Sequence, residues 1–192
     1  MNILIVRLGA LGDIVHTIPA VAALRAAMPA AQIDWLVEAK HRAMVDLVEG
    51  VDRVIALEGR SIAAWVDALR RVRTLAYDAA LDFQGLMKSA VLARASGARR
   101  VAGFSVWHLR EKSARAFYSE TGAGDGDDAT HVIRKNLSLL EVLGVSSSAI
   151  EFPLREVVSP ALERVRQDRG GAPFALINPG AAWPNKRWQP ER

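Results

Sequence analysis

Cysteine is absent from this chain of 192 residues, which excludes both a disulfide framework and a thiolate metal site. No apolar run approaches the roughly 20 residues that cross a membrane. The opening nine residues are interrupted by Arg7 and Gly9 too early for a secretory signal. The G-x-G-x-x-G pattern is also missing, because positions 7 and 15 hold arginine and valine. We therefore expect a cytoplasmic protein without the usual dinucleotide fingerprint.

Charge is unevenly distributed along the chain. The formal net charge is +4, yet the interval from Leu57 to Arg115 holds eleven Arg and Lys against five Asp and Glu. Such a surface attracts anions, whether a phosphorylated substrate, an anionic membrane face or nucleic acid. A solvated face without a ligand accounts for the charge equally well. The basic residues are not interleaved with stacking aromatics, which argues against nucleic-acid binding.

Apolar residues make up 51% of the chain, and strand-like runs alternate with helix-like periodicities. This alternation predicts an α/β fold with a Rossmann-like, doubly wound parallel sheet. We expect strands at 2–6, 33–37, 53–57, 79–83, 100–103 and 174–177. We expect helices at 14–28, 41–48, 62–75, 86–95, 112–118 and 131–143. Pro19 predicts a kink or a later start, near Thr17, in the first helix, and Trp65 and Leu69 should face the core.

A break in the pattern at Arg169-Gly170-Gly171 predicts a domain boundary. Residues 1–168 are expected to form one Rossmann-like domain. Residues 169–192 are expected to form a linker and the first strand and loop of a second such domain. A single strand cannot form a domain, so we expect the sequence to be truncated.

The first candidate site is the loop at 8–13, because ligands of such sheets bind beyond the carboxyl ends of the strands. Gly9 and Gly12 permit a tight turn and the close approach of a ligand to backbone N–H groups. Asp13 follows in the first helical turn. It either caps or electrostatically stabilises the helix, or acts as a general base toward a hydroxyl nucleophile. His16 lies three residues on and could bond to Asp13.

The second candidate site is the loop at 84–88, which follows the fourth strand. Asp82 and Gln84 should project on one side of the strand end, since side chains alternate. Gly85 would clear space for a ligand, and Lys88 would hold an anionic group. A plain strand-to-helix turn with a solvated lysine is the alternative.

The third candidate site is the stretch from 178 to 188, which is rich in proline and glycine and carries adjacent Lys186 and Arg187. A lysine offers a compact charge for a diphosphate. Such a loop after a buried strand favours binding over a purely structural connection.

These three segments together resemble glycosyltransferase family 9, the ADP-heptose:lipopolysaccharide heptosyltransferases. The segment from Leu8 to Pro19 looks like the opening of that family. The segment from Asp82 to Ala90 is similar to the D-x-Q-G-L-x-K-S-A segment of its heptosyltransferase I subfamily. Arg110-Glu111 and His131 fit the same subfamily, and the 178–188 stretch resembles the start of the nucleotide-sugar-binding domain. The likeness spans the whole chain.

The resemblance implies a GT-B fold, with the acceptor on the first Rossmann-like domain and ADP-heptose mainly on the second. It implies inverting, metal-independent transfer of heptose to Kdo of Kdo2-lipid A. Asp13 would be the catalytic base, and Lys186 would stabilise the leaving diphosphate. Of the further substrate-binding residues that the resemblance implies, Arg60, Lys88, Arg110 and His131 would bind acceptor carboxylates and phosphates. The others are Gly9, Gly12, Gln84 and Gly85.

No cofactor is expected beyond the donor. The resemblance implies metal independence, although the sequence holds one Asp-x-Asp pair, Asp125-Gly126-Asp127. The expected partners are ADP-heptose and Kdo2-lipid A at the cytoplasmic face of the inner membrane, with no nucleic acid and no stable protein partner. This fragment alone should be inactive. The alternatives are a family 9 enzyme with another donor or acceptor, or the nucleotide-binding domain of an oxidoreductase.

Overall fold

The computed structural model of the chain describes residues 1–59, 61–122, 130–157, 159–170, 172–173, 175, 177, 179–180 and 187–188. Within this part, the strands form one parallel sheet in the order β3-β2-β1-β4-β5-β6. They are β1 (Asn2–Val6), β2 (Gln32–Glu38), β3 (Arg53–Leu57), β4 (Ala79–Asp82), β5 (Arg100–Gly103) and β6 (Glu120–Thr121). This is the doubly wound Rossmann arrangement, in which the strand order reverses between β1 and β4. The predicted fold class is confirmed.

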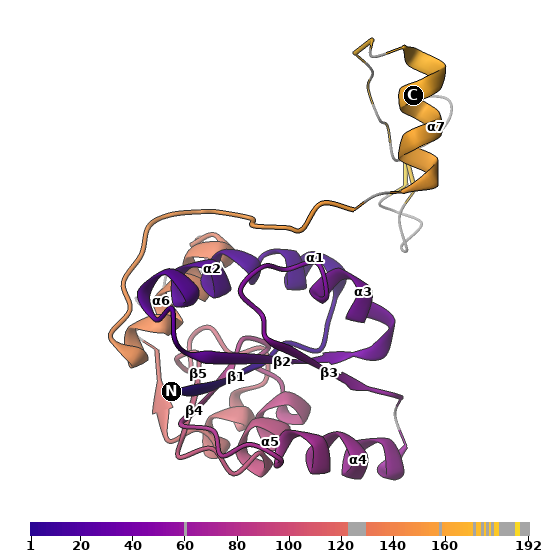
Figure 1. Cartoon of the computed structure of the whole chain (residues 1–192). Coiled ribbons are helices and arrows are strands. Elements are labelled where there is room, and N and C mark those ends of the chain that lie inside the picture. The colour runs from indigo at the N-terminus through magenta and orange to yellow at the C-terminus, as the bar shows by residue number, and fades with distance from the viewer. Residues whose placement is uncertain are drawn as a thin grey trace. The chain divides into compact units, whose positions relative to one another are not determined.

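Helices cover both faces of the sheet, as Figure 1 shows. One layer contains α1 (Leu11–Val15), α2 (Ile18–Ala27), α3 (Arg42–Val45) and α6 (Val132–Leu139). The opposite layer contains α4 (Ile62–Val72) and α5 (Met87–Ala95). Short 3-10 helices are η1 (Ala39–His41), η2 (Lys112–Phe117) and η3 (Leu140–Leu143), and α7 (Pro160–Arg169) lies near the C-terminus.

The core forms on both faces of the central strands. The last four residues of β1 are fully buried, and so are Ile33 and Trp35 in β2. Continuous apolar runs of this kind suit a parallel strand, because helices cover both of its faces. In α4, Trp65 and Leu69 pack against this core, which confirms their predicted inward orientation.

The helix predicted at 14–28 is divided into α1 and α2, and α2 begins immediately after Thr17. Pro19 has no N–H to donate into the preceding turn, so the predicted start near Thr17 is confirmed. The helix predicted at 41–48 ends at Val45. Its continuation pairs with a returning segment through an antiparallel bridge between Val48 and Leu154 and a hydrogen bond from Arg155 N to Leu47 O.

Two short elements were not predicted from the sequence. β6 adds a two-residue strand beside β5, and α7 begins with Pro160 after the capping residue Ser159. A serine followed by proline is a common helix start, so this signal was present. Residues 174 and 176 of the strand predicted at 174–177 lie outside the described residues, so this strand stays a prediction.

The chain divides into two compact units, residues 1–155 and 156–192. The first contains the whole sheet, and the second contains α7. The assignment of residues 1–168 and 169–192 to two domains stays a prediction.

Candidate active site

The carboxyl ends of β1 and β4 lie side by side at the point where the strand order reverses. Open α/β sheets bind their ligands at this position. The loops that leave these two strands contain the first two candidate sites. They are tied together by backbone and side-chain hydrogen bonds, among them Phe83 N to Val6 O at 3.1 Å. The predicted pair of loops therefore forms one site.

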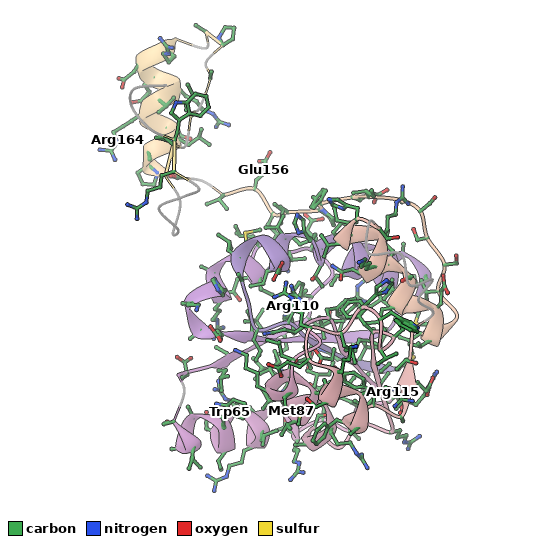
Figure 2. The ribbon with its side chains drawn as sticks, turned by 180° about the vertical axis from the view of Figure 1, so that it is seen from behind. Trp65, Met87, Arg110, Arg115, Glu156 and Arg164 are labelled. Carbon is green, nitrogen blue, oxygen red and sulfur yellow. The ribbon has the colours of Figure 1, made fainter. Side chains whose placement is uncertain are left out.

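Asp13 lies in the first turn of α1, but it is not the capping residue. Ala10 occupies that position, and no side chain there accepts a capping bond. The Oδ2 atom of Asp13 instead accepts from two guanidinium groups, Arg7 Nη2 at 2.6 Å and Arg110 Nη2 at 3.0 Å. In Figure 2, Arg110 reaches toward the helix layer that contains α1. The carboxylate is thus held between two cations, with its side chain 21% exposed.

Arg7 is a site residue that the sequence analysis missed. It is 3% exposed and lies directly after β1, where its Nη1 atom donates to the Phe83 carbonyl. Burial lowers the pKa of its guanidinium; the charge of Asp13 acts in the opposite direction, and the charge of Arg110 adds to the lowering. The sequence could have indicated a role for Arg7, because it lies at the carboxyl end of a central strand, where such folds bind ligands.

Gln84 links the two loops. Its Oε1 atom accepts from Leu8 N at 2.8 Å, and the residue is 5% exposed. The neighbouring Asp82 is fully buried and accepts from Gln84 N, Gly85 N, Ser89 Oγ and Tyr118 Oη. Burial raises the pKa of Asp82, while these hydrogen bonds oppose the rise. Asp82 therefore fixes the backbone of the second loop through its hydrogen bonds to Gln84 N and Gly85 N. Gln84 in turn fixes the first loop through its hydrogen bond with Leu8 N.

The space beside Gly85 is filled by the chain itself. A Cβ atom there would lie 3.2 Å from Leu109 Cδ2 and 3.6 Å from Arg110 N, and its φ of +68° favours glycine. Glu111 N donates to Gly85 O at 3.1 Å. The glycine thus admits the segment that delivers Arg110. Direct contact of Gly85 with a substrate stays a prediction.

Lys88, at the start of α5, donates to Glu38 Oε1 at 3.3 Å, and Lys40 binds the other oxygen of Glu38 at 2.7 Å. Burial raises the pKa of Glu38, but the two lysines outweigh it, and the net result is a lowered pKa. Lys88 remains 43% exposed, and its ammonium group has donors beyond the one that binds Glu38, so contact with an anion stays a prediction.

The two glycines of the first loop differ in their surroundings. A Cβ atom on Gly9 would lie 3.2 Å from His41 Nε2, whereas one on Gly12 would meet nothing within 4 Å. Gly12 therefore leaves open space at the start of α1. This is the one feature of the loop that itself suits the close approach of a ligand.

His131 is the capping residue of α6, where its Nδ1 atom accepts from Ile133 N at 3.3 Å. Its ring contacts the edge of the His16 ring at a centroid distance of 5.7 Å. His16 Nδ1 is buried without a hydrogen-bond partner in the described part of the chain, so the expected bond to Asp13 is not observed there. Asn136 Nδ2 donates to His16 O at 2.8 Å, which fixes α6 beside the turn after α1.

A pocket of about 200 Å³ opens beside the ion-paired carboxylate. Its lining is Arg7, Phe83, Gln84, Phe104, His108, Arg110, Thr130, Val132, Lys135 and Asn136. Among the described residues, the lining has three cations, Arg7, Arg110 and Lys135, and no carboxylate, a composition that favours an anionic group. Lys135 was missed from the sequence, although it lies one helical turn after His131 on the same helix.

Two predicted site residues, Arg60 and Lys186, lie outside the described residues. In the described part, no group of three or more His, Asp or Glu side chains is arranged to hold a metal ion. Metal independence stays a prediction.

The chain is similar to known glycosyltransferases over its length. Lipopolysaccharide heptosyltransferase 1 of Pseudomonas aeruginosa is 30% identical over 98% of this chain and 54% of the relative. The structure described as E. coli heptosyltransferase WaaC with ADP superposes with a TM-score of 0.71 at 27% identity, covering 79% of this chain and 50% of that one. The glycosyl transferase family 9 structure from Veillonella parvula DSM 2008 has a TM-score of 0.79 at 22% identity, covering 99% and 57%, and supports the fold.

These relatives are longer than the chain, which spans about half of their length. The family model described as "Glycosyltransferase family 9 (heptosyltransferase)" matches residues 51–192. The likeness to the solved heptosyltransferase structures bears out the predicted GT-B class for the part that the chain covers. The family match favours a glycosyltransferase over the oxidoreductase alternative. The chain belongs to glycosyltransferase family 9.

Proposed function

We propose that this chain is the acceptor-binding part of an inverting, metal-independent transferase that moves heptose from ADP-L-glycero-D-manno-heptose to Kdo of Kdo2-lipid A. The observation that carries the proposal is the Asp13 carboxylate at the sheet's switch point, beside a pocket that favours anions. The Pseudomonas aeruginosa relative is named a lipopolysaccharide heptosyltransferase, and the E. coli heptosyltransferase structure holds ADP; both support an ADP-linked heptose donor and a lipopolysaccharide acceptor.

In the proposed reaction, a Kdo hydroxyl oxygen attacks the anomeric carbon of the heptose. The hydroxyl proton passes to the Asp13 carboxylate, the bond from the anomeric carbon to the diphosphate oxygen breaks, and ADP leaves with the electron pair. Lys186 would stabilise the charge that develops on the diphosphate. Arg60, Lys88, Arg110 and His131 would bind acceptor carboxylates and phosphates.

Arg110 also gives the acceptor a way to affect the base. A carboxylate oxygen that already accepts from two guanidinium groups has little room left to accept from a hydroxyl group. Arg110 is 55% exposed at its side chain, so an acceptor carboxylate in the pocket can compete for it. Binding of the anionic sugar would then release Arg110 from Asp13, and Asp13 would keep its contact with Arg7.

We further propose that the protein works at the cytoplasmic face of the inner membrane, where its lipid acceptor is exposed. Within the described residues, none of the helices has the length and apolar character needed to cross a bilayer. The basic surplus between Leu57 and Arg115 would attract anionic lipid headgroups.

The test is a transfer assay on the complete gene product, with product masses measured by mass spectrometry. We expect the mass of one heptose to be added to Kdo2-lipid A from ADP-heptose, at a rate that EDTA leaves unchanged. Transfer from another nucleotide sugar, or to another acceptor only, would replace this proposal with a different family 9 activity. Loss of the rate with EDTA and its return with a divalent cation would contradict metal independence.

Replacing Gly12 with alanine should separate activity from stability. Alanine is favoured over glycine in a helix, and its Cβ would meet nothing within 4 Å, so the free energy of unfolding should rise by about 0.5 kcal/mol. The same methyl group would occupy the open space at the start of α1, and we expect a rate about tenfold lower, the size of a 1.4 kcal/mol loss. Chemical denaturation and the transfer assay on one preparation measure both. A gain in stability with an unchanged rate would show that no ligand approaches Gly12.

A further inference from the structure

Arg7 combines features that a solvated surface arginine does not have. It is 3% exposed, its Nη2 atom contacts Asp13 Oδ2 at 2.6 Å, and its Nη1 atom donates to the Phe83 carbonyl. One rigid guanidinium plane therefore joins the end of β4 to the first turn of α1. Because the fork geometry of arginine is fixed, anchoring one nitrogen also fixes where the other can hold the carboxylate.

The backbone of Arg7 is fixed as firmly as its side chain. Arg7 N donates to Leu36 O at 3.2 Å, and Trp35 Nε1 donates to Arg7 O at 3.1 Å. Both partners belong to β2, the neighbouring strand. The next residue, Leu8, donates to Gln84 Oε1 in the loop that directly follows β4. Arg7 is thus held by strands on both sides of β1, which makes it a rigid support for Asp13.

The burial of Arg7 is hard to explain by stability alone. A buried cation loses hydration, and its attraction to a partner often fails to compensate for that loss. Burial lowers the pKa of Arg7, and the second cation Arg110 adds to this effect. Its Nε atom is also buried without a hydrogen-bond partner among the described residues. Functional sites often hold a charged group that loses hydration on burial, and here that group lies beside the candidate base Asp13.

We propose that Arg7 is a positioning residue for the catalytic base, which orients the Asp13 carboxylate through the bridge from Phe83 O to Asp13 Oδ2. The inference rests on the proposed function of Asp13. It assigns different roles to the two arginines: Arg7 is the permanent partner that sets geometry, and the exposed Arg110 is the exchangeable one. Although Arg7 lines the pocket, its Nη1 and Nη2 atoms are occupied by the Phe83 carbonyl and Asp13, so we expect it to affect the rate at saturation more than the affinity for either substrate.

The test uses Arg7→Met and Arg7→Lys in the complete gene product, with kcat and both KM values measured in the transfer assay. We expect Arg7→Met to lower kcat about a hundredfold, the effect of misplacing a catalytic group by about 1 Å, with each KM changed less than threefold. Arg7→Lys keeps the charge but cannot bridge two acceptors in the same plane, so it should recover about tenfold of that loss. If Arg7→Met fails to fold, the tenfold loss of kcat in Arg7→Lys decides the matter.

The matched control is Arg53→Met. Arg53 also binds a buried carboxylate, Asp34 at 2.7 Å, but it does so at the amino end of β3, away from the site. We expect this variant to lower the melting temperature while kcat per folded enzyme stays unchanged. Arg7→Met should show the opposite pattern, because Asp13 is partly exposed and keeps Arg110.

A double-mutant cycle separates failure of this inference from failure of the proposed function. If Asp13→Asn lowers transfer about a thousandfold and Arg7→Met causes no further loss of the residual rate in that background, Arg7 acts through Asp13. An inactive Asp13→Asn together with a fully active Arg7→Met would overturn the inference and leave the base in place. A fully active Asp13→Asn would overturn the assignment of the base, and the role of Arg7 with it.

Discussion

Replacing Asp13 with asparagine should lower the rate of heptose transfer about a thousandfold, within the range that general-base catalysis contributes. The amide has no proton affinity comparable to that of the carboxylate. The variant removes the charge that faces Arg7, which is 3% exposed, but the amide oxygen can still accept a hydrogen bond from its guanidinium. Single-turnover transfer to Kdo2-lipid A measures the rate, and thermal unfolding checks that the fold persists.

Asparagine is a cleaner substitution here than alanine. Asp13→Ala would remove the acceptor that Arg7 Nη2 has among the described residues, and an unpaired buried charge can cost about 3–5 kcal/mol. Lost activity in that variant could then reflect lost structure. The matched control is Asp67→Asn in α4, whose carboxylate pairs with Arg71 and is 60% exposed. It should leave the rate unchanged, and near-normal turnover of Asp13→Asn would contradict its role as the base.

Replacing Gly103 with alanine should give the largest loss of stability. A Cβ atom there would lie 2.2 Å from Tyr118 Cε2 and 2.4 Å from Tyr118 Cζ, far inside van der Waals contact. The ring cannot simply turn aside, because Tyr118 Oη donates to the buried Asp82 Oδ2 at 2.6 Å. Overpacking and a lost buried hydrogen bond together should cost about 3 kcal/mol. For a chain of this size, the melting temperature should fall by about 10 °C.

The cause of this loss can be tested by removing the ring. In a Tyr118→Ala background the added methyl group has no ring to meet, so Gly103→Ala should cost less than about 1 kcal/mol there. Chemical denaturation of the four proteins of this cycle gives the coupling energy. Equal costs in both backgrounds would show that the clash with Tyr118 is not the reason for the glycine.

The fold could be predicted from the sequence where one local pattern determines each element. Residues 2–6, 53–57 and 100–103 form strands with the predicted bounds, because short apolar runs between turn signals have few alternatives. The early end of the helix at Val45 could not be predicted, since it depends on pairing with a segment more than one hundred residues later in the chain. The two-residue β6 exists only through its pairing with β5, and its own sequence carries no strand signal.

The candidate site was predictable in position but less so in the roles of its residues. Asp13 and Gln84 were singled out from their loops, and the structure brings both loops to the same end of the sheet. The ion pair of Asp13 with Arg110 joins residues 97 positions apart, a contact that no local pattern contains. Arg7 interrupts an apolar run in the sequence, and only the tertiary structure shows that this cation is buried.

The bonds that run from Asp82 through Gln84 to Leu8 have a consequence for exchanging parts between relatives. The first loop is held in place by the second, so neither is an independent module. In a chimera that takes only residues 7–13 from another family member, the transferred loop would contact a second loop whose sequence did not evolve with it. Grafts should therefore succeed when residues 7–13 and 82–89 are transferred together, and specificity in this family should be inherited as a pair of loops.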